Sequence, residues 1–276
     1  WIEIHNRNTT PFDISGYHLT DDPANMTKWS FPTNTILDGN EYFVVFASGS
    51  DKPDSAGNLH TSFNLSANGE YLALTSPDGT TIVQEFPPTY PPQKTDTSYT
   101  SEGFLSLPSP GSPNTGIAQQ GYVRDTTFDV DRGHYKEPFD VTIETGTPDS
   151  KIYYTLDGTY PAPDNGSLYS GPITISTTTI LRAAGFKDNF IPTNVDTQSY
   201  IFLNDIVNQS NNPPNTTSMW AGRIADYEMD PQIVDDPKYA DKIIPALQKF
   251  PSLSLTTTHT TKTAIPSLRG EQNPAG

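Results

Sequence analysis

The first part of the chain alternates apolar and polar residues in short runs that are separated by turn residues. Ile2 and Ile4 alternate with Glu3 and His5, and similar runs recur up to residue 90. Alternation with a period of two places successive side chains on opposite faces of a strand. The runs follow one another at the roughly 8–12-residue spacing that is typical of a β-sandwich. The pattern therefore predicts a sandwich over residues 1–115.

Residues 42–46 (YFVVF) are apolar at every position. Alternate residues of a strand point to opposite faces, so both faces of this one are apolar. Such a run is typical of a strand that is buried on both sides. We therefore expect it to be central in its sheet.

The apolar runs at residues 71–74 and 82–86 lie on either side of the segment Ser-Pro-Asp-Gly at residues 76–79. Proline at the second position and glycine at the fourth are typical of a type I turn. We therefore predict that the two runs pair as a hairpin.

Five segments of this part follow one another in a recognisable order: WIEIHN (1–6), DISGYHLTD (13–21), KWSFP (28–32), GNEYFVVFASG (39–49) and FNLSANGEYLAL (63–74). Together they resemble the lamin tail domain in its bacterial form. The resemblance implies an immunoglobulin-like sandwich. Members of that family usually carry one more strand before the Trp-Ile-Glu motif with which this sequence starts, so we expect an unpaired strand edge.

Residues 87–128 are rich in proline, with pairs at 87–88 and 91–92 and a cluster over 108–113. Proline lacks the N–H that a strand ladder needs, so this stretch predicts a connector. We place the boundary between two modules near residue 120.

Apolar alternation resumes over residues 121–203 and predicts a second module. Ile152, Tyr154 and Leu156 alternate and lead into Asp157 and Gly158, a turn dipeptide. Four further strands are expected at residues 139–143, 173–175, 180–184 and 200–203.

The segments IYYTLDGT (152–159), YSGPI (169–173) and TILRAA (179–184) resemble the chitobiase/β-hexosaminidase C-terminal domain. The resemblance implies a second small immunoglobulin-like sandwich that accompanies catalytic units and is not one itself. The expected fold class is therefore all-β, with two tandem immunoglobulin-like β-sandwiches and a short, partly helical C-terminal tail.

Residues 204–276 form this tail. Acidic residues at 235–236 followed by Pro237 are typical of a helix start, and apolar residues at 239, 243, 247 and 250 form a stripe. Pro245 interrupts the stripe, because it removes a donor and clashes with the preceding turn. We expect a helix from about Pro237 that bends or ends near Ile244, packed weakly on the second module or not at all. The polar end is expected to be disordered.

Residues 220–231 (WAGRIADYEMDP) resemble the segment that precedes the catalytic part of CotH-like proteins, a spore-coat kinase-like family. In many of these proteins the two module types come first, in the same order. The resemblance implies that the kinase-like part would lie beyond residue 255. A kinase needs a glycine-rich phosphate loop, a lysine and metal-binding acids, and no such loop precedes a helix here. We therefore expect that this chain is not an enzyme.

The charge and composition of the chain limit the classes of partner that it can bind. Asp and Glu number 32 against 16 Lys and Arg, giving a net charge of −16 and no basic cluster that could attract nucleic acid. The absence of cysteine excludes disulfides and thiolate chemistry. No apolar run approaches the ~20 residues of a transmembrane helix. We infer an extracellular or cell-surface location, although the sequence contains no signal peptide.

Metal and cofactor candidates are few. Asp125, Asp129 and Asp131 share one loop and suggest calcium, but Gly133 stands where a further oxygen ligand belongs and no glutamate closes the site. The five histidines are dispersed, and His5 with the histidine at position 18 is the one pair considered for zinc. No cofactor is predicted.

Tyr90, Tyr160 and Tyr169 lie near Pro and Gly in expected loops and are candidates for stacking on sugar rings. The alternative is that these rings pack over the ends of the sandwiches.

We therefore expect non-catalytic structural or interaction modules of a secreted or cell-surface bacterial protein. They would act as spacer and docking surface for a protein or cell-envelope partner. Two alternatives remain open: an accessory region that presents a CotH-like kinase domain to its substrate, and a carbohydrate-binding accessory module.

Overall fold

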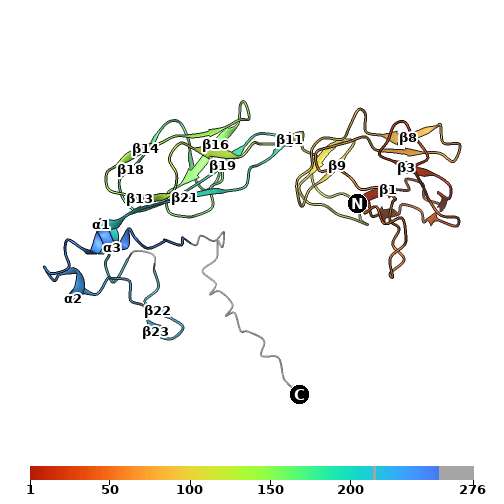
Figure 1. Ribbon diagram of the computed structural model, residues 1–276. Coiled ribbons are helices and arrows are strands. Elements are labelled where there is room, and N and C mark those ends of the chain that lie inside the picture. Colours follow the sequence, from red (N-terminus) through yellow and green to blue (C-terminus); the bar gives the residue numbers. More distant parts are fainter. Residues whose placement is uncertain (214–215, 255–276) are drawn as a thin grey trace, which may run out of the picture. The chain divides into compact units, whose positions relative to one another are not determined.

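The computed structural model describes residues 1–213 and 216–254, in which the chain forms two compact units (Figure 1). The first unit is Trp1–Gly121, and the second begins at Tyr122. Most of the regular structure is strand, and the three helices among the described residues have four or five residues each. The all-β fold class predicted from the sequence is confirmed.

Short antiparallel strands build the first unit. A four-stranded sheet has the order β4 (Trp29–Ser30), β3 (His18–Thr20), β7 (Ala73–Thr75) and β8 (Ile82–Glu85). Three further pairs are β1 (Ile2–His5) with β6 (Tyr42–Val45), β2 (Phe12–Asp13) with β5 (Ile36–Leu37), and β9 (Ser98–Thr100) with β10 (Gly103–Leu105).

The core of the first unit is built from side chains of the four-stranded sheet and of the strand pairs. Ile2 and Val45 come from the β1–β6 pair, whereas Leu19 and Trp29 come from the four-stranded sheet, and all four are buried in one cluster. Two sheets that share one apolar interior form a sandwich. The buried members of this cluster are Ile2, Ile14, Leu19, Trp29, Phe31, Leu37, Val45 and Phe63.

The predicted hairpin is present, because β7 and β8 pair antiparallel. Gly79 has φ +67° and donates its backbone N–H to the carbonyl of Ser76 at 2.9 Å. The carboxylate of Asp78 accepts the backbone N–H groups of Thr80 and Thr81, each at 2.8 Å. The turn chemistry and the register therefore agree.

The prediction that residues 42–46 form a central strand buried on both sides is wrong. Among the described strands, β6 pairs only with β1, and the only fully buried side chain of β6 is Val45. Phe46 lies just beyond the strand and is 38% exposed. Phe43 and Val45 face the core, whereas Tyr42, stacked on His5, and Val44 are only half-buried on the opposite face.

One edge of β1 is unpaired among the described strands. The backbone N–H of Asn6 bonds to the carbonyl of Glu41 at 2.9 Å, so even-numbered residues of this strand exchange hydrogen bonds with β6. The backbone groups of Glu3 and His5 consequently point to the other edge. An unpaired edge in the first module is what the lamin tail resemblance implied.

The second unit is built around a five-stranded sheet (Figure 1). Its order is β13 (Gly133–Tyr135), β21 (Asp196–Phe202), β19 (Thr179–Phe186), β16 (Lys151–Thr155) and β17 (Ser167–Leu168), and β13 runs parallel to β21. Further pairs are β14 (Phe139–Val141) with β18 (Ile173–Ile175), β12 (Thr126–Phe128) with β15 (Ile143–Thr145), and β11 (Gly121–Tyr122) with β20 (Phe190–Ile191).

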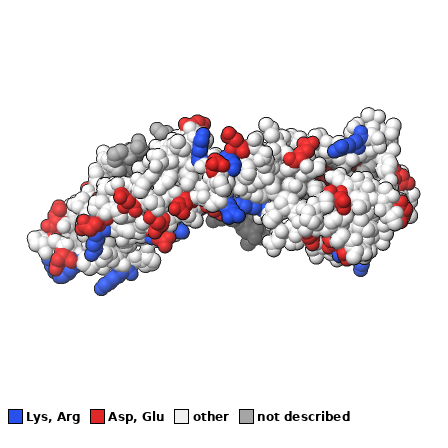
Figure 2. Space-filling model, turned by 90° about the horizontal axis from the view of Figure 1, so that it is seen from above, with Lys and Arg blue, Asp and Glu red and all other residues white. Residues whose placement is uncertain are grey.

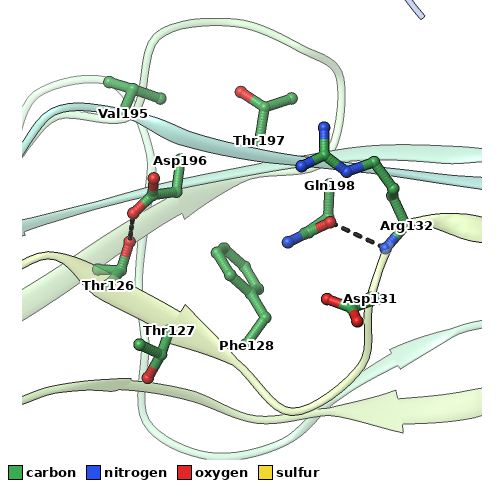
Figure 3. Close-up of a pocket in the computed structure, with 9 residues that line it drawn as sticks. All are labelled: Thr126, Thr127, Phe128, Asp131, Arg132, Val195, Asp196, Thr197 and Gln198. Carbon is green, nitrogen blue, oxygen red and sulfur yellow. Dashed lines mark hydrogen bonds between the residues drawn. The ribbon is translucent and has the colours of Figure 1, made fainter. Parts of the chain in front are cut away.

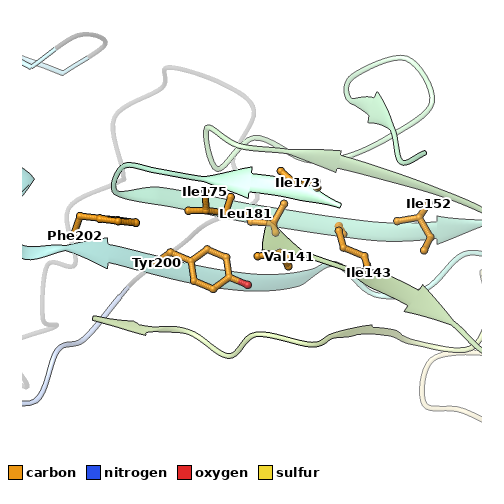
Figure 4. Packing of buried hydrophobic residues seen from close by; sticks show 9 residues of the cluster. Val141, Ile143, Ile152, Ile173, Ile175, Leu181, Tyr200 and Phe202 are labelled. Carbon is orange, nitrogen blue, oxygen red and sulfur yellow. The ribbon is translucent and has the colours of Figure 1, made fainter. Parts of the chain in front are cut away.

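The second core lies between the five-stranded sheet and the strands that face it (Figure 4). Leu181 and Tyr200 on the sheet and Val141 on β14 have no exposed surface. The expected strands at 139–143, 152–156, 173–175, 180–184 and 200–203 all contribute to this cluster or to its edge. Its buried members are Val141, Ile143, Ile152, Ile173, Ile175, Leu181, Ala183, Tyr200 and Phe202.

The tail contains short elements in place of the expected helix from Pro237. They are α1 (Leu203–Val207), β22 (Met219–Trp220), β23 (Arg223–Ile224), α2 (Pro231–Val234) and α3 (Ile243–Leu247). Pro245 lies in the first turn of α3 and does not end a helix near Ile244. The first N–H groups of a helix have no intrahelical partner, so proline costs little there. The prediction of a helix starting at Pro237 is therefore wrong.

The tail contacts the rest of the second unit. Helices α1 and α3 touch each other, and Ile243 of α3 is buried. Further along, the Ser252 hydroxyl lies 2.9 Å from His134 Nε2, and the hydroxyls of Ser254 and Ser199 are 2.6 Å apart. The polar end predicted to be disordered lies outside the described residues.

No helix among the described residues combines the length and the apolar character that crossing a membrane requires.

Candidate functional site

A cleft of about 480 Å³ opens on the second unit between β12 and the start of β21 (Figure 3). Its wall combines an aromatic ring with carboxylate, amide, guanidinium and hydroxyl groups. The volume is in the range of small-molecule sites. The lining residues are Thr126, Thr127, Phe128, Asp131, Arg132, Val195, Asp196, Thr197 and Gln198.

The two walls of the cleft are held by contacts across the unit. The Tyr200 hydroxyl donates to the backbone carbonyl of Val130 at 2.8 Å. The Tyr135 hydroxyl donates to the backbone carbonyl of Asp131 at 2.5 Å. Both rings stand in the core or against it, so they tie the loop before β13 to the sheet.

Hydrogen bonds inside the cleft fix two of its polar side chains. Asp196 accepts from the hydroxyl of Thr126 at 2.5 Å and from the amide of Asn194 at 3.1 Å. The side-chain carbonyl of Gln198 accepts the backbone N–H of Arg132 at 2.9 Å (Figure 3). The carboxylate of Asp196 therefore has both oxygens engaged, whereas the amide N–H groups of Gln198 have no acceptor among the residues that the structure describes.

The three tyrosines proposed for sugar stacking lie in different surroundings. Tyr90 belongs to the first unit and is only 6% exposed, and its hydroxyl donates to the Ser66 carbonyl at 2.8 Å. Burial raises the pKa of Tyr90 well above its usual range. Tyr169 is half-buried against the second core, and its hydroxyl accepts the Ile143 N–H at 3.1 Å. Tyr160, at 36% exposed, is the one that offers a ring face to solvent.

The acids proposed for calcium do not meet at one point. Asp129 accepts the backbone N–H of Thr142 at 2.7 Å. Hydrogen bonds from Thr142, first from its side chain and then from its backbone, lower the pKa of the Asp129 carboxyl. The carboxylate of Asp131 lines the cleft, whereas Asp125 does not line it. Among the described residues, no three His, Cys, Asp or Glu side chains could together hold a metal ion.

The histidines considered for zinc also have other contacts. His5 stacks on Tyr42 with ring centroids 4.0 Å apart, and His18 Nδ1 lies 2.7 Å from the hydroxyl of Ser30. Each ring is thus engaged with a neighbour on an adjacent strand.

The sequence reasoning missed one arrangement of catalytic residue types. His60 Nδ1 lies 2.7 Å from the Ser48 hydroxyl, and its Nε2 lies 3.6 Å from a carboxylate oxygen of Asp54. The side chain of Asn58 is the main cause of the pKa of Asp54 falling to about 2. The Ser48 hydroxyl also contacts the hydroxyl of Ser50, and the backbone N–H of Gly49 donates to the carbonyl of Phe63. A nucleophile needs an oxyanion donor nearby, and this N–H is not free to be one.

A larger groove of about 990 Å³ lies in the first unit beside the unpaired edge of β1. The side chains of Ile4, Tyr17 and Leu74 line it and are only half-buried, although they pack against the core. Val83 of β8 also lines the groove and is 53% exposed. The groove therefore offers apolar surface next to free backbone hydrogen-bonding groups.

Each unit contains a match to the model of a known domain family. Residues 1–86 match the family model described as Lamin Tail Domain. Residues 130–197 match the model described as Chitobiase/beta-hexosaminidase C-terminal domain. Both families are immunoglobulin-like accessory domains that are not catalytic themselves. Searches of the curated proteins and of the solved structures gave no match.

The two matches place each surface in a domain type. Most of the groove beside β1 is lined by residues within the Lamin Tail Domain match, and the cleft with Phe128 and Gln198 lies at the edge of the chitobiase-type match. Figure 2 shows acidic side chains dispersed over the visible face of the described residues, without an extended basic area. This charge distribution agrees with the net charge of −16 and disfavours polyanionic partners.

Proposed function

We propose that the chain is a non-catalytic interaction region of a secreted or cell-surface bacterial protein. Its two immunoglobulin-like units act as spacer and docking surfaces. The proposal is carried by the two family matches, because both matched domain types are accessory domains that are not catalytic themselves. The groove of the first unit, which half-buried apolar side chains line, supplies a candidate docking surface.

The occupant that we assign to this groove is an extended peptide segment of a protein partner. Glu3 and His5 direct backbone N–H and carbonyl groups toward the free edge, so a peptide strand would pair with them. Alternate apolar side chains of that strand would reach Ile4 and Leu74, which line the groove. Main-chain pairing supplies affinity in this binding mode, and the side-chain pockets supply specificity.

A peptide-display selection on the full chain, followed by calorimetry with the selected synthetic peptide, tests this assignment. Val83→Glu should weaken binding at least 10-fold, because it places a charge on the groove wall. Ile82→Glu is the matched control, since Ile82 is 41% exposed on the same strand and does not line the groove. Equal losses in both variants, or selected peptides that bind elsewhere, would reject the groove as the docking surface.

The interaction role also predicts that the chain alone turns over no substrate. ATP-dependent phosphotransfer or ester hydrolysis that survives repurification, and that Ser48→Ala abolishes, would overturn the non-catalytic assignment. The resemblance of residues 220–231 to CotH-like proteins supports one alternative setting, in which the two modules present a kinase-like domain to its substrate.

A second candidate function is carbohydrate binding by the chitobiase-type unit. The cleft favours it, because an aromatic ring and several hydrogen-bonding side chains line one cavity there. Sedimentation of the chain with insoluble cell-wall polysaccharide tests this function independently of the groove.

A further inference from the structure

The cleft of the second unit has one aromatic wall. Phe128 on β12 is half-buried: one part of its side chain packs against the core, and Figure 3 shows its ring projecting into the cleft. An aromatic face that is fixed by packing costs little ordering when a flat, partly apolar ligand stacks on it.

Polar groups around this ring have unused hydrogen-bonding capacity. The guanidinium of Arg132 forms no ion pair within the described part of the chain. The Gln198 amide is oriented by its carbonyl, which accepts the Arg132 N–H, and no acceptor within the described part of the chain takes its two N–H donors. Asp131 adds an exposed carboxylate that accepts hydrogen bonds.

The balance of charges decides the ligand class. Two carboxylates, Asp131 and Asp196, face one guanidinium in the cleft, so a phosphate or another anion would meet net negative charge. A divalent cation would meet Arg132 and too few oxygen ligands. An apolar ligand would leave the Gln198 and Arg132 donors unpaired. A neutral ligand with hydroxyl groups on its rim and a C–H face satisfies all of these groups.

We propose that this cleft binds one ring of a neutral sugar, with Phe128 as the stacking face and Gln198, Arg132 and Asp131 as hydrogen-bonding groups. The proposal rests on the second proposed function and names its site. Both donors and acceptors line the cleft beside Phe128, and sugar hydroxyls both donate and accept. The site differs from the sequence-based candidates Tyr160 and Tyr169, which do not line this cleft.

Titration of the full ¹⁵N-labelled chain with cellopentaose, xylopentaose and mannopentaose tests the proposal, with trigalacturonate as an acidic comparison. At least one neutral probe should produce saturable shifts of the Arg132 and Gln198 backbone amides and of the Gln198 side-chain amide. Saturation by trigalacturonate alone would show an anion site, and no saturable shift with any neutral probe at millimolar concentration would overturn the proposal.

Variants then locate the binding. Gln198→Glu keeps the oxygen that accepts from Arg132 and removes the amide donors, and it should weaken binding at least 10-fold. Arg132→Ala and Phe128→Leu should also weaken it, the leucine keeping an apolar group against the core. Arg223→Ala is the control, because this arginine is exposed on β23 and does not line the cleft.

The outcomes separate the site from the function. If cell-wall polysaccharide sediments the wild-type chain and Gln198→Glu equally, carbohydrate binding stands and the cleft is not its site. If no polysaccharide or neutral probe binds, both the function and the site fall.

Discussion

The hydroxyl of Tyr200 donates a hydrogen bond of 2.8 Å to the backbone carbonyl of Val130, a residue 70 positions earlier in the chain. Tyr200 is fully buried in the second core, and burial raises the pKa of its hydroxyl above the usual range. The group therefore stays protonated and remains a donor at every ordinary pH.

Tyr200→Phe should lower the free energy of unfolding of the second unit by about 1–2 kcal/mol, because the carbonyl of Val130 loses its donor. Urea denaturation followed by far-ultraviolet circular dichroism measures the change. Tyr160→Phe is the control at an exposed ring and should change stability by less than about 0.5 kcal/mol. A Tyr200→Phe protein as stable as wild type would show that the bond does not hold the loop before β13.

Gly69→Ala should destabilise the first unit by about 2–4 kcal/mol. The backbone φ of Gly69 is +88°, and an added Cβ would collide with the backbone carbonyl oxygen of Tyr90. Gly57→Ala is a matched comparison, since φ is +85° there but no atom lies within 4 Å of the new Cβ. Gly57→Ala should lower the free energy of unfolding by only about 1–2 kcal/mol, which is the cost of alanine in a left-handed backbone conformation. Equal losses would mean that the Tyr90 segment is not held against Gly69.

The first unit should lose stability as the pH falls from about 4 to 2. Hydrogen bonds, first of all from the Asn58 side chain, lower the pKa of Asp54 from 3.8 to about 2, and the backbone N–H of Thr81 is the main cause of a lowered pKa at Asp78. A carboxyl whose pKa is lower in the folded state than in the unfolded state stabilises the fold at pH values above its unfolded pKa. This stabilisation is lost as the pH falls and the carboxyl becomes protonated.

Urea midpoints measured between pH 5 and pH 2 show this dependence. Asp78→Asn should flatten it, because the amide does not titrate. A midpoint that is independent of pH over this range would contradict the assignment.

Pro245→Ala should change stability by less than about 0.5 kcal/mol, because Pro245 occupies the first turn of α3, where its missing N–H has no intrahelical partner. Ala246→Pro is the opposite case. It removes the 2.9 Å bond from the Ala246 N–H to the Lys242 carbonyl and should unravel α3. Amide hydrogen exchange at Leu247 and Gln248 measures the effect of each substitution on α3. A large gain in protection in Pro245→Ala would show that proline interrupts a longer helix.

The two units should unfold independently, with the first less stable than the second. The first has an unpaired edge on β1 and a groove that exposes part of its core, whereas the second has a closed cluster around Tyr200. Residues 122–254 made alone should unfold cooperatively in urea. A second unit that is molten alone but ordered in the full chain would contradict this division.

Local chemistry explains which parts of the fold the sequence predicted. The turn at residues 76–79 was predictable because Asp78 and Gly79 determine it through neighbouring atoms. Strand β6 was misplaced because apolar side chains on both faces do not distinguish burial in a core from half-burial in aromatic contacts, such as that of Tyr42 with His5. Sheet position depends on partners far along the chain, and no local pattern encodes them.

The cleft was not predictable from local patterns for the same reason. Phe128 and Gln198 are far apart in sequence, and the pairing of β13 with β21 brings their surroundings together. Asp131 was singled out from the sequence, but for calcium. It lines the cleft together with Gln198, and among the described residues no three acidic or histidine side chains gather there to hold a metal, which changes the chemistry that it supports.

The parallel pairing of β13 with β21 has a mechanical consequence for the proposed spacer role. Strand β13 lies toward the beginning of the second unit, and β21 is its last strand before the tail. Tension applied through the two ends of the unit pulls parallel neighbours in opposite directions along their own axes. The hydrogen bonds between residues 133–135 and 200–202 are then loaded in shear at the same time, rather than broken one after another. Such a unit resists stretching most strongly at the strand from which the tail departs.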